Sequence, residues 1–188
     1  PYTIQHDFSQ YDILIIADFG HGMFNKEIAH QLAQLNTPYK TIMAQTNSSN
    51  MGFNRIDKYK RANMYCIDKV EMQLCLNQKE EMELHEQLQE LSGCITFDRL
   101  YITTGSKGAV LYVNGELMQF PALAKKVIDP IGAGDAFLSL ASLVSYLNYS
   151  NELSLLIPSL ASAMNTQWLC NEKSITKTEF IETAKKVI

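Results

Sequence analysis

Short apolar strands alternate with helices along most of this 188-residue chain, and this alternation restricts the fold more than any other feature. Asp12 to Ala17 is a continuous apolar run, which is typical of a parallel strand buried on both faces. A helical pattern follows from Asn25 to Leu35, with Asn25 as its N-cap. Strands that alternate with helices in this way favour an α/β fold, with helices on both faces of one sheet. We expect one domain over residues 1–188.

The remaining elements are predicted from hydrophobic periodicity and turn residues. Further strands are expected at Tyr39 to Ala44, Asn63 to Ile67, Arg99 to Thr103, Ala109 to Val113 and Glu116 to Phe120. Further helices are expected at Asp57 to Arg61, Lys69 to Leu76, Glu80 to Leu91, Ala136 to Leu147, Glu152 to Leu169 and Lys177 to Val187. The pair Asn114-Gly115 predicts a tight hairpin turn between the last two strands.

Composition narrows the class of protein. The net charge is −4, so no general attraction to nucleic acid or to an anionic membrane is expected. No apolar run is long enough to span a bilayer, and no signal peptide is visible at the start. The four cysteines form no Cys-x-x-Cys pair, which favours a reduced cytoplasmic protein over a disulfide scaffold or a zinc site. The chain opens at Pro1 and soon enters a strand-like run, which is typical of a piece of a longer polypeptide.

The transition from loop to helix at Val127 to Leu138 is the most informative segment for function. Pro130 disfavours helical continuation from the residue before it. Gly132 and Gly134 allow a sharp turn and close approach of a ligand to the backbone. The first amides of the following helix have no partner within that helix, so they form an anion site. Asp135 at the same end would repel a bound phosphate, but it suits a base that accepts a proton from an attacking hydroxyl.

A Gly-x-Gly-Asp sequence at a helix start also occurs as an ordinary turn with an acidic first residue. The fuller pattern, Asp-x-x-Gly-Ala-Gly-Asp over residues 129–135, resembles the C-terminal signature of the ribokinase-like (phosphofructokinase B) carbohydrate kinases. The resemblance implies a three-layer αβα sandwich with a mainly parallel sheet. It also implies that Asp135 is the catalytic base and that the amides of Gly132, Ala133 and Gly134 form an anion hole. Pro130-Ile131 replaces the Thr or Val-Thr usual in the family, which affects a hydroxyl contact but not the backbone site.

Two further strand ends are rich in residues that suit ligand contacts, since ligands of open α/β sheets bind beyond the carboxyl ends of strands. The segment Asp18-Phe19-Gly20-His21-Gly22 resembles a segment beside the active site in the heptose-phosphate kinase branch of the family, so Asp18, Gly20 and Gly22 are predicted to bind substrate. The segment over residues 104–108 resembles the family's nucleotide loop, which predicts cofactor contacts from Thr104, Gly105, Ser106 and Gly108. Each segment is also compatible with a plain turn.

Four more positions complete the candidate site. Glu71, in Asp68-Lys69-Val70-Glu71, matches a family position that organises magnesium and phosphate, although Asp-x-x-Glu is also the pattern of a capping box. Asn165 lies in a late helix that contributes to the adenine pocket of the family, and simple helix packing is the alternative.

Asp129 is predicted to bind substrate. The family's Asp-Pro-Lys or Asp-x-Asn is missing at residues 44–48, where Gln45 and Asn47 could serve as neutral contacts.

The leading hypothesis is an ATP-dependent kinase of a sugar or sugar phosphate, with ATP and Mg²⁺ as cofactors. The family's N-terminal signature, sugar-gripping Asp and β lid are not found in this sequence, so we expect the chain to be the C-terminal nucleotide and phosphoryl-transfer part of a longer kinase. A homodimer is left open. One alternative is a non-catalytic nucleotide-binding or assembly module. Another is a dinucleotide-dependent oxidoreductase, which the lack of Gly-x-Gly-x-x-Gly after the first strand disfavours.

Overall fold

The computed structural model describes residues 4–35, 39–46, 52–77, 82–170 and 172–187. The chain forms two compact units, each built from two stretches of sequence. Unit 1 comprises Pro1–Ile102 and Tyr112–Glu116, and unit 2 comprises Thr103–Leu111 and Leu117–Ile188. The expected single domain stays a prediction.

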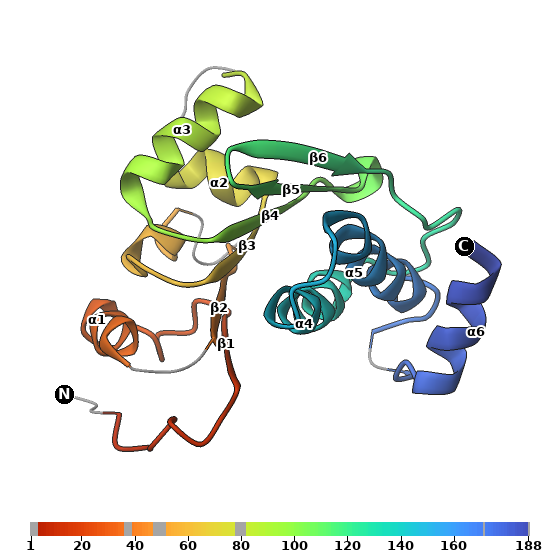
Figure 1. The fold of residues 1–188 in the computed structure, drawn as a ribbon, viewed down its shortest axis with the longest axis horizontal. Coiled ribbons are helices and arrows are strands. Elements are labelled where there is room, and N and C mark those ends of the chain that lie inside the picture. The colour runs from red at the N-terminus through yellow and green to blue at the C-terminus, as the bar shows by residue number, and fades with distance from the viewer. Residues whose placement is uncertain (1–3, 36–38, 47–51, 78–81, 171, 188) are drawn as a thin grey trace. The chain divides into compact units, whose positions relative to one another are not determined.

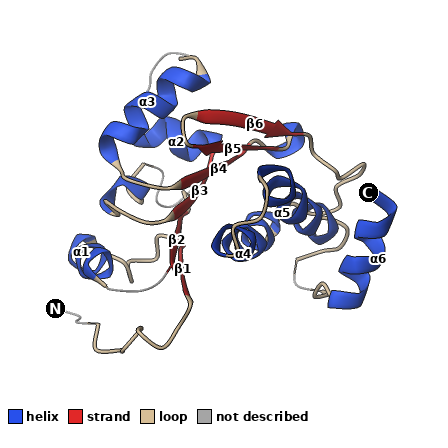
Figure 2. Cartoon of the chain, in the orientation of Figure 1, coloured by secondary structure: helices blue, strands red, loops and turns tan. Residues whose placement is uncertain are grey.

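Six strands form one sheet in the order in which they occur in the sequence. They are β1 (Ile13–Asp18), β2 (Tyr39–Ala44), β3 (Met64–Asp68), β4 (Arg99–Thr103), β5 (Ala109–Val113) and β6 (Glu116–Phe120). The pairs β1–β2 and β2–β3 are parallel. Strands alternate with helices, as Figure 2 shows, so the α/β class and the mainly parallel sheet are confirmed.

The register of β1 and β2 places their carboxyl ends at the same edge, because Asp18 pairs with Ala44 and Ile13 with Tyr39. The backbone amide of Gln45, just after β2, donates to the carbonyl oxygen of Asp18 at 2.7 Å. Gln45, which follows β2, therefore lies beside the end of β1, at the kind of strand edge where open α/β sheets bind ligands.

The helices of unit 1 are α1 (Lys26–Gln34), the 3₁₀ turn η1 (Ile56–Lys58), α2 (Lys69–Cys75) and α3 (Leu84–Cys94). Asn25 caps α1, since its Oδ1 accepts from the amide of Ile28 at 2.9 Å. Asp68 caps α2. The buried core of this unit includes the large side chains of Ile42, Met64, Tyr65, Leu91 and Leu100.

The helices of unit 2 are the 3₁₀ turn η2 (Gly105–Lys107), α4 (Ala133–Tyr146), α5 (Asn151–Asn165) and α6 (Lys177–Val187). Helices α4 and α5 pack side by side, and α6 contacts α5 (Figure 1). Buried Phe137, Ala141 and Leu155 provide apolar contact surface on these helices. None of the helices in the described part of the chain is both long and apolar enough to cross a membrane.

Several element boundaries differ from those expected; α3, for example, ends at Cys94 rather than Leu91. Helix α4 begins at Ala133 rather than Ala136, because Gly132 adopts the left-handed conformation of a helix boundary with φ of +79°. Helix α5 ends at Asn165 rather than Leu169, where the carbonyl of Thr166 accepts from the amides of Ile128 and Asp129. The short helix expected at Asp57 to Arg61 is the 3₁₀ turn η1.

Candidate active site

The loop before α4 is fixed by hydrogen bonds from side chains. Asp129 is buried, and its Oδ1 accepts from the amide of Ile131 at 2.9 Å. Its Oδ2 accepts from the amide of Cys170 at 2.9 Å and from the Cys170 thiol at 3.4 Å. The hydrogen bonds from Ile131 and Cys170 lower the pKa of Asp129, so it is a carboxylate at neutral pH. Asp129 therefore shapes the loop, and its predicted contact with substrate stays a prediction.

Asn165 of α5 contacts the same loop. Its Nδ2 donates to the carbonyl of Ile131 at 3.0 Å. A Cβ atom added to Gly132 would lie 3.2 Å from this Nδ2. Gly132 is thus required both by its positive φ and by the closeness of Asn165. The structure brings Asn165 to the glycine loop, where it supports the backbone; its predicted contact with nucleotide is not tested.

The first turn of α4 has backbone amides that form no hydrogen bond within the helix. The amide of Ala133 donates to the carbonyl of Pro130 at 3.2 Å. No side chain caps this helix end, and the amides of Gly132, Gly134 and Asp135 make no hydrogen bond to any residue within the described ranges. With the positive end of the helix dipole, these groups can receive an anion.

Asp135 lies in this first turn with an unsatisfied carboxylate oxygen. Its Oδ1 is buried and has no hydrogen-bond partner in the part of the chain that the structure describes. Burial raises the pKa of Asp135 above its usual value. Buried polar atoms without partners are rare and need an explanation. Proton acceptance from a bound hydroxyl would satisfy this oxygen.

The segment from Thr104 to Gly108 forms a closed turn at the end of β4. The amide and the hydroxyl of Thr104 both donate to the carbonyl of Gly108, each at 2.9 Å. Gly108 has φ of +101°, and an added Cβ would lie 2.0 Å from the carbonyl oxygen of Phe120. Gly108 is therefore needed for the close approach of two backbone segments, whereas Gly105 and Ser106 are exposed. Their predicted contacts with nucleotide stay predictions.

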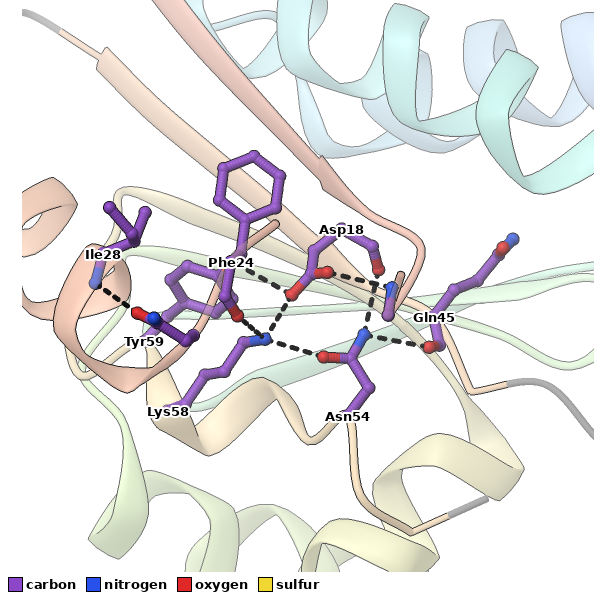
Figure 3. A network of polar contacts seen from close by, with 9 residues as sticks. Asp18, Phe24, Ile28, Gln45, Asn54, Lys58 and Tyr59 are labelled. Atoms are coloured by element: carbon purple, nitrogen blue, oxygen red, sulfur yellow. Dashed lines mark hydrogen bonds and ion pairs between the residues drawn. The ribbon is translucent and has the colours of Figure 1, made fainter. Parts of the chain in front are cut away.

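Asp18, at the end of β1, is 2% exposed and lies at the centre of the polar network in Figure 3. Its Oδ1 accepts from the amide of Gly20 at 3.0 Å. Its Oδ2 accepts from the Tyr59 hydroxyl at 2.9 Å and pairs with Lys58 Nζ at 2.5 Å. Burial, followed by the negative charge of Asp18, raises the pKa of Tyr59 and keeps the phenol protonated. The carboxylate thus organises the Asp18–Gly22 turn, in which Gly22 is exposed.

Glu71 forms the capping box that was the alternative to a magnesium site. Its Oε2 accepts from the amide of Asp68 at 3.0 Å, and its Oε1 accepts from the amide of Thr46, just after β2, at 2.8 Å. Burial raises the pKa of Glu71 to about 7. No group of three or more metal-binding side chains occurs among the described residues. Gln45 accepts from Asn54 through its carbonyl, and Asn47 lies outside the described residues.

Sequence reasoning missed Asn54, Lys58 and Tyr59, which surround Asp18, and Cys170, which binds Asp129. These residues belong to no motif and lie 36 to 41 positions from the aspartates that they contact. Asn54 and Lys58 are four positions apart, and Lys58 Nζ donates to Asn54 Oδ1 at 2.7 Å. This spacing is a local signal that could have predicted their contact.

The family profile described as pfkB family carbohydrate kinase matches residues 5–167. The chain belongs to this family. It is 27% identical over 158 residues to "Bifunctional protein HldE" of Campylobacter fetus subsp. fetus, covering 83% of the chain and 33% of that protein. The chain thus spans about a third of the length of this relative.

Solved structures of other proteins share the fold of this chain. Phosphofructokinase-2 from Escherichia coli, in complex with potassium, superposes with a TM-score of 0.75 at 14% identity, covering 93% of this chain and 57% of that one. Arabidopsis thaliana ribokinase, complexed with ribose and ATP, gives a TM-score of 0.72 at 16% identity, covering 93% and 56%. These similarities establish the ribokinase-like fold that the sequence motifs predicted.

Proposed function

We propose that this chain is the nucleotide-binding and phosphoryl-transfer part of an ATP-dependent kinase that phosphorylates a hydroxyl of a sugar or sugar phosphate. The proposal rests chiefly on Oδ1 of Asp135, which is buried without a partner among the described residues, at a helix start with open amides. A carboxylate repels a bound phosphate, so its presence at an anion site is better explained by proton acceptance than by phosphate binding. Membership of a carbohydrate kinase family supports this assignment.

In this mechanism, Asp135 accepts the proton of the attacking hydroxyl. The raised pKa of Asp135 makes it a stronger base than an exposed carboxylate. The amides of Gly132 and Gly134, together with that of Asp135, hold oxygens of the transferred phosphoryl group, where negative charge must be stabilised. The amide of Ala133, also predicted to belong to the anion hole, already donates to the carbonyl of Pro130. Asp129 and Asn165 fix the loop in advance, so little reorganisation is needed when the phosphoryl group arrives.

Nucleotide contacts are assigned to Thr104, Gly105, Ser106 and Gly108, together with Asn165. A magnesium ion would neutralise the phosphate charge, as it does in kinases generally. Mg²⁺ binds few protein carboxylates and keeps waters and phosphate oxygens as ligands. Both oxygens of Glu71 already accept backbone amides, so Glu71 fits a contact through water better than direct coordination.

The acceptor is assigned to the turn that contains Asp18, Gly20 and Gly22, on the basis of its likeness to the heptose-phosphate kinase branch. Suitable probes are ribose, fructose 6-phosphate, a heptose 7-phosphate and a nucleoside. Asp18 is engaged by Lys58 and Tyr59, so the exposed backbone of the turn, rather than this carboxylate, would contact the acceptor.

The second candidate is a non-catalytic nucleotide-binding or assembly module. One observation favours it: the carboxylates of Asp18 and Asp129, both predicted to bind substrate, are engaged in internal hydrogen bonds. This candidate requires ATP binding without transfer to any of the four probes, even when the full-length chain is supplied.

The test is Asp135→Asn in the full-length protein that contains these residues, with ATP binding measured by calorimetry and transfer measured with the four probes. We expect turnover to fall about 100-fold to 10,000-fold, the range for loss of a general base, while ATP binding is retained. Glu152→Gln is the matched control, because Glu152 is also an acid in the first turn of a helix; its turnover should equal that of wild type. Substantial turnover by Asp135→Asn would exclude the base, and ATP binding without transfer by wild type would favour the second candidate.

A further inference from the structure

The turn that follows β1 is held to its surroundings by the partly buried ammonium group of Lys58. Lys58 Nζ pairs with Asp18 Oδ2 at 2.5 Å, and it donates to the Phe24 carbonyl at 2.5 Å and to Asn54 Oδ1 at 2.7 Å. The side chain is 12% exposed. Figure 3 shows the ammonium group between these three acceptors.

The three acceptors belong to different parts of the chain. Asp18 ends β1, Phe24 precedes α1, and Asn54 lies just before η1. The segment between Asp18 and Phe24 is thus held at both ends by the same nitrogen atom. Asn54 extends the connection, because its Nδ2 donates at 3.1 Å both to the Asp18 carbonyl and to the Gln45 carbonyl after β2.

Lys58 has no donor left for a ligand. An ammonium group has three N–H donors, and three protein acceptors already account for them. Its charge is also balanced by a carboxylate that is 2% exposed. These contacts exclude a direct salt bridge to a substrate phosphate in this conformation, and they leave a role in holding the turn.

We propose that Lys58 is a positioning residue for the acceptor, which fixes the Asp18–Phe24 segment so that the backbone of Gly20 and Gly22 is held ready for the sugar. The inference rests on the proposed function for its catalytic consequence, but the fixing of the segment can be tested without activity. Ordering the segment before binding removes an entropy cost that would otherwise weaken acceptor binding.

The chain offers a matched control in a second lysine of the same unit. Lys40 Nζ donates to the carbonyls of Leu32 and Ala33 near the end of α1, at 2.9 and 3.3 Å. Lys40 lies near the start of β2, away from the end that pairs with Asp18. Tyr59→Phe is a second comparison, because it removes a hydrogen bond to the same Asp18 oxygen without releasing Phe24 or Asn54.

The experiment measures amide hydrogen exchange and steady-state kinetics for Lys58→Met, Lys40→Met and Tyr59→Phe. For Lys58→Met we expect exchange at residues 18–24 to accelerate by at least about tenfold, which corresponds to one lost hydrogen bond to a charged group. The KM of whichever of the four probes wild type phosphorylates should rise by a similar factor, while the KM of ATP stays unchanged. Lys40→Met should show neither a faster exchange of residues 18–24 nor a higher acceptor KM. Tyr59→Phe removes one hydrogen bond to Asp18 but keeps the contacts of Lys58 with Phe24 and Asn54, so both of its changes should be smaller than those of Lys58→Met.

If Lys58→Met does not fold, Asn54→Ala takes its place, since it removes an acceptor of Lys58 without leaving a buried carboxylate unpaired. An equal rise of acceptor KM in Lys40→Met, or unchanged exchange at residues 18–24 in the folded Lys58 or Asn54 variant, would overturn the proposal. If wild type transfers phosphate to none of the probes, the proposed function fails, and the exchange data still decide whether Lys58 holds the segment.

Discussion

At the scale of single residues, the two glycines of the Gly132-Ala133-Gly134 sequence have different tasks. Gly132 has φ of +79°, and an added Cβ would lie 3.2 Å from Asn165 Nδ2. Gly134 lies inside the first turn of α4, and an added Cβ would meet nothing within 4 Å. The sequence motif treats both as parts of one anion hole, but only Gly132 is required by the backbone.

This difference predicts opposite effects on stability. Gly132→Ala should lower the free energy of unfolding by about 1–2 kcal/mol, the cost of a left-handed backbone for a residue with a Cβ. Gly134→Ala should leave it unchanged or raise it by up to about 1 kcal/mol, because alanine favours the helix. Urea unfolding of both variants beside wild type measures the two changes. Equal destabilisation by both would show that the loop before α4 is not held as described.

At the scale of secondary-structure elements, local patterns predicted both bounds of five elements correctly. The bounds of β2, β4, β5, β6 and α6 are those expected, because each segment has clear periodicity and turn residues at its ends. The end of α5 was wrong, since it depends on Thr166, whose carbonyl accepts from Ile128 and Asp129. Such contacts between distant segments leave no local pattern in the sequence.

The candidate site likewise combines features that local sequence predicts with contacts that it does not predict. The backbone turn at Gly132 and the position of Asp135 follow from local sequence, and both were predicted. The partners that hold Asp129 and Asp18 were not predicted, because Cys170 and Lys58 are ordinary residues until the fold brings them to a carboxylate. Local sequence can indicate groups for chemistry, whereas the supporting contacts arise from tertiary structure.

The connection between β2 and α2 depends on Glu71, which predicts a pH dependence. The pKa of Glu71 is about 7 in the folded protein, against an ordinary value of 4.5 for the unfolded chain. Between these pH values the folded state keeps a proton that the unfolded state has released, so stability should fall as pH rises from about 4.5 to about 7. The loss from this group is about 3 kcal/mol at most.

Thermal unfolding of wild type and Glu71→Gln across this pH range measures the effect. Carboxylates with lowered pKa, such as Asp129 and Glu179, give a slope of opposite sign at lower pH, so the difference between the two proteins is the informative quantity. We expect the stability of Glu71→Gln relative to wild type to increase as pH rises. A constant difference would mean that Glu71 titrates near its ordinary pKa.

At the scale of the whole molecule, the candidate residues divide between the two compact units. The proposed base, the open amides and the Thr104–Gly108 turn belong to unit 2, whereas Asp18, Gly20, Gly22 and Glu71 belong to unit 1. The proposed nucleotide contacts thus lie within unit 2, whereas the turn assigned to the acceptor lies within unit 1. Each ligand should therefore slow amide hydrogen exchange in a different set of residues.

This division predicts that ATP alone protects unit 2. A ligand at 100 times its Kd stabilises the state that binds it by about 2.7 kcal/mol, so amide exchange at residues 104–108 and 131–136 should slow when ATP and Mg²⁺ are added. Residues 18–24 should keep the exchange rate of the free protein until an acceptor from the probe set is present. Slowing at residues 18–24 with ATP alone, and none at residues 131–136, would place the nucleotide in unit 1. That result would contradict the assignment of the transferred phosphoryl group to the amides at the start of α4.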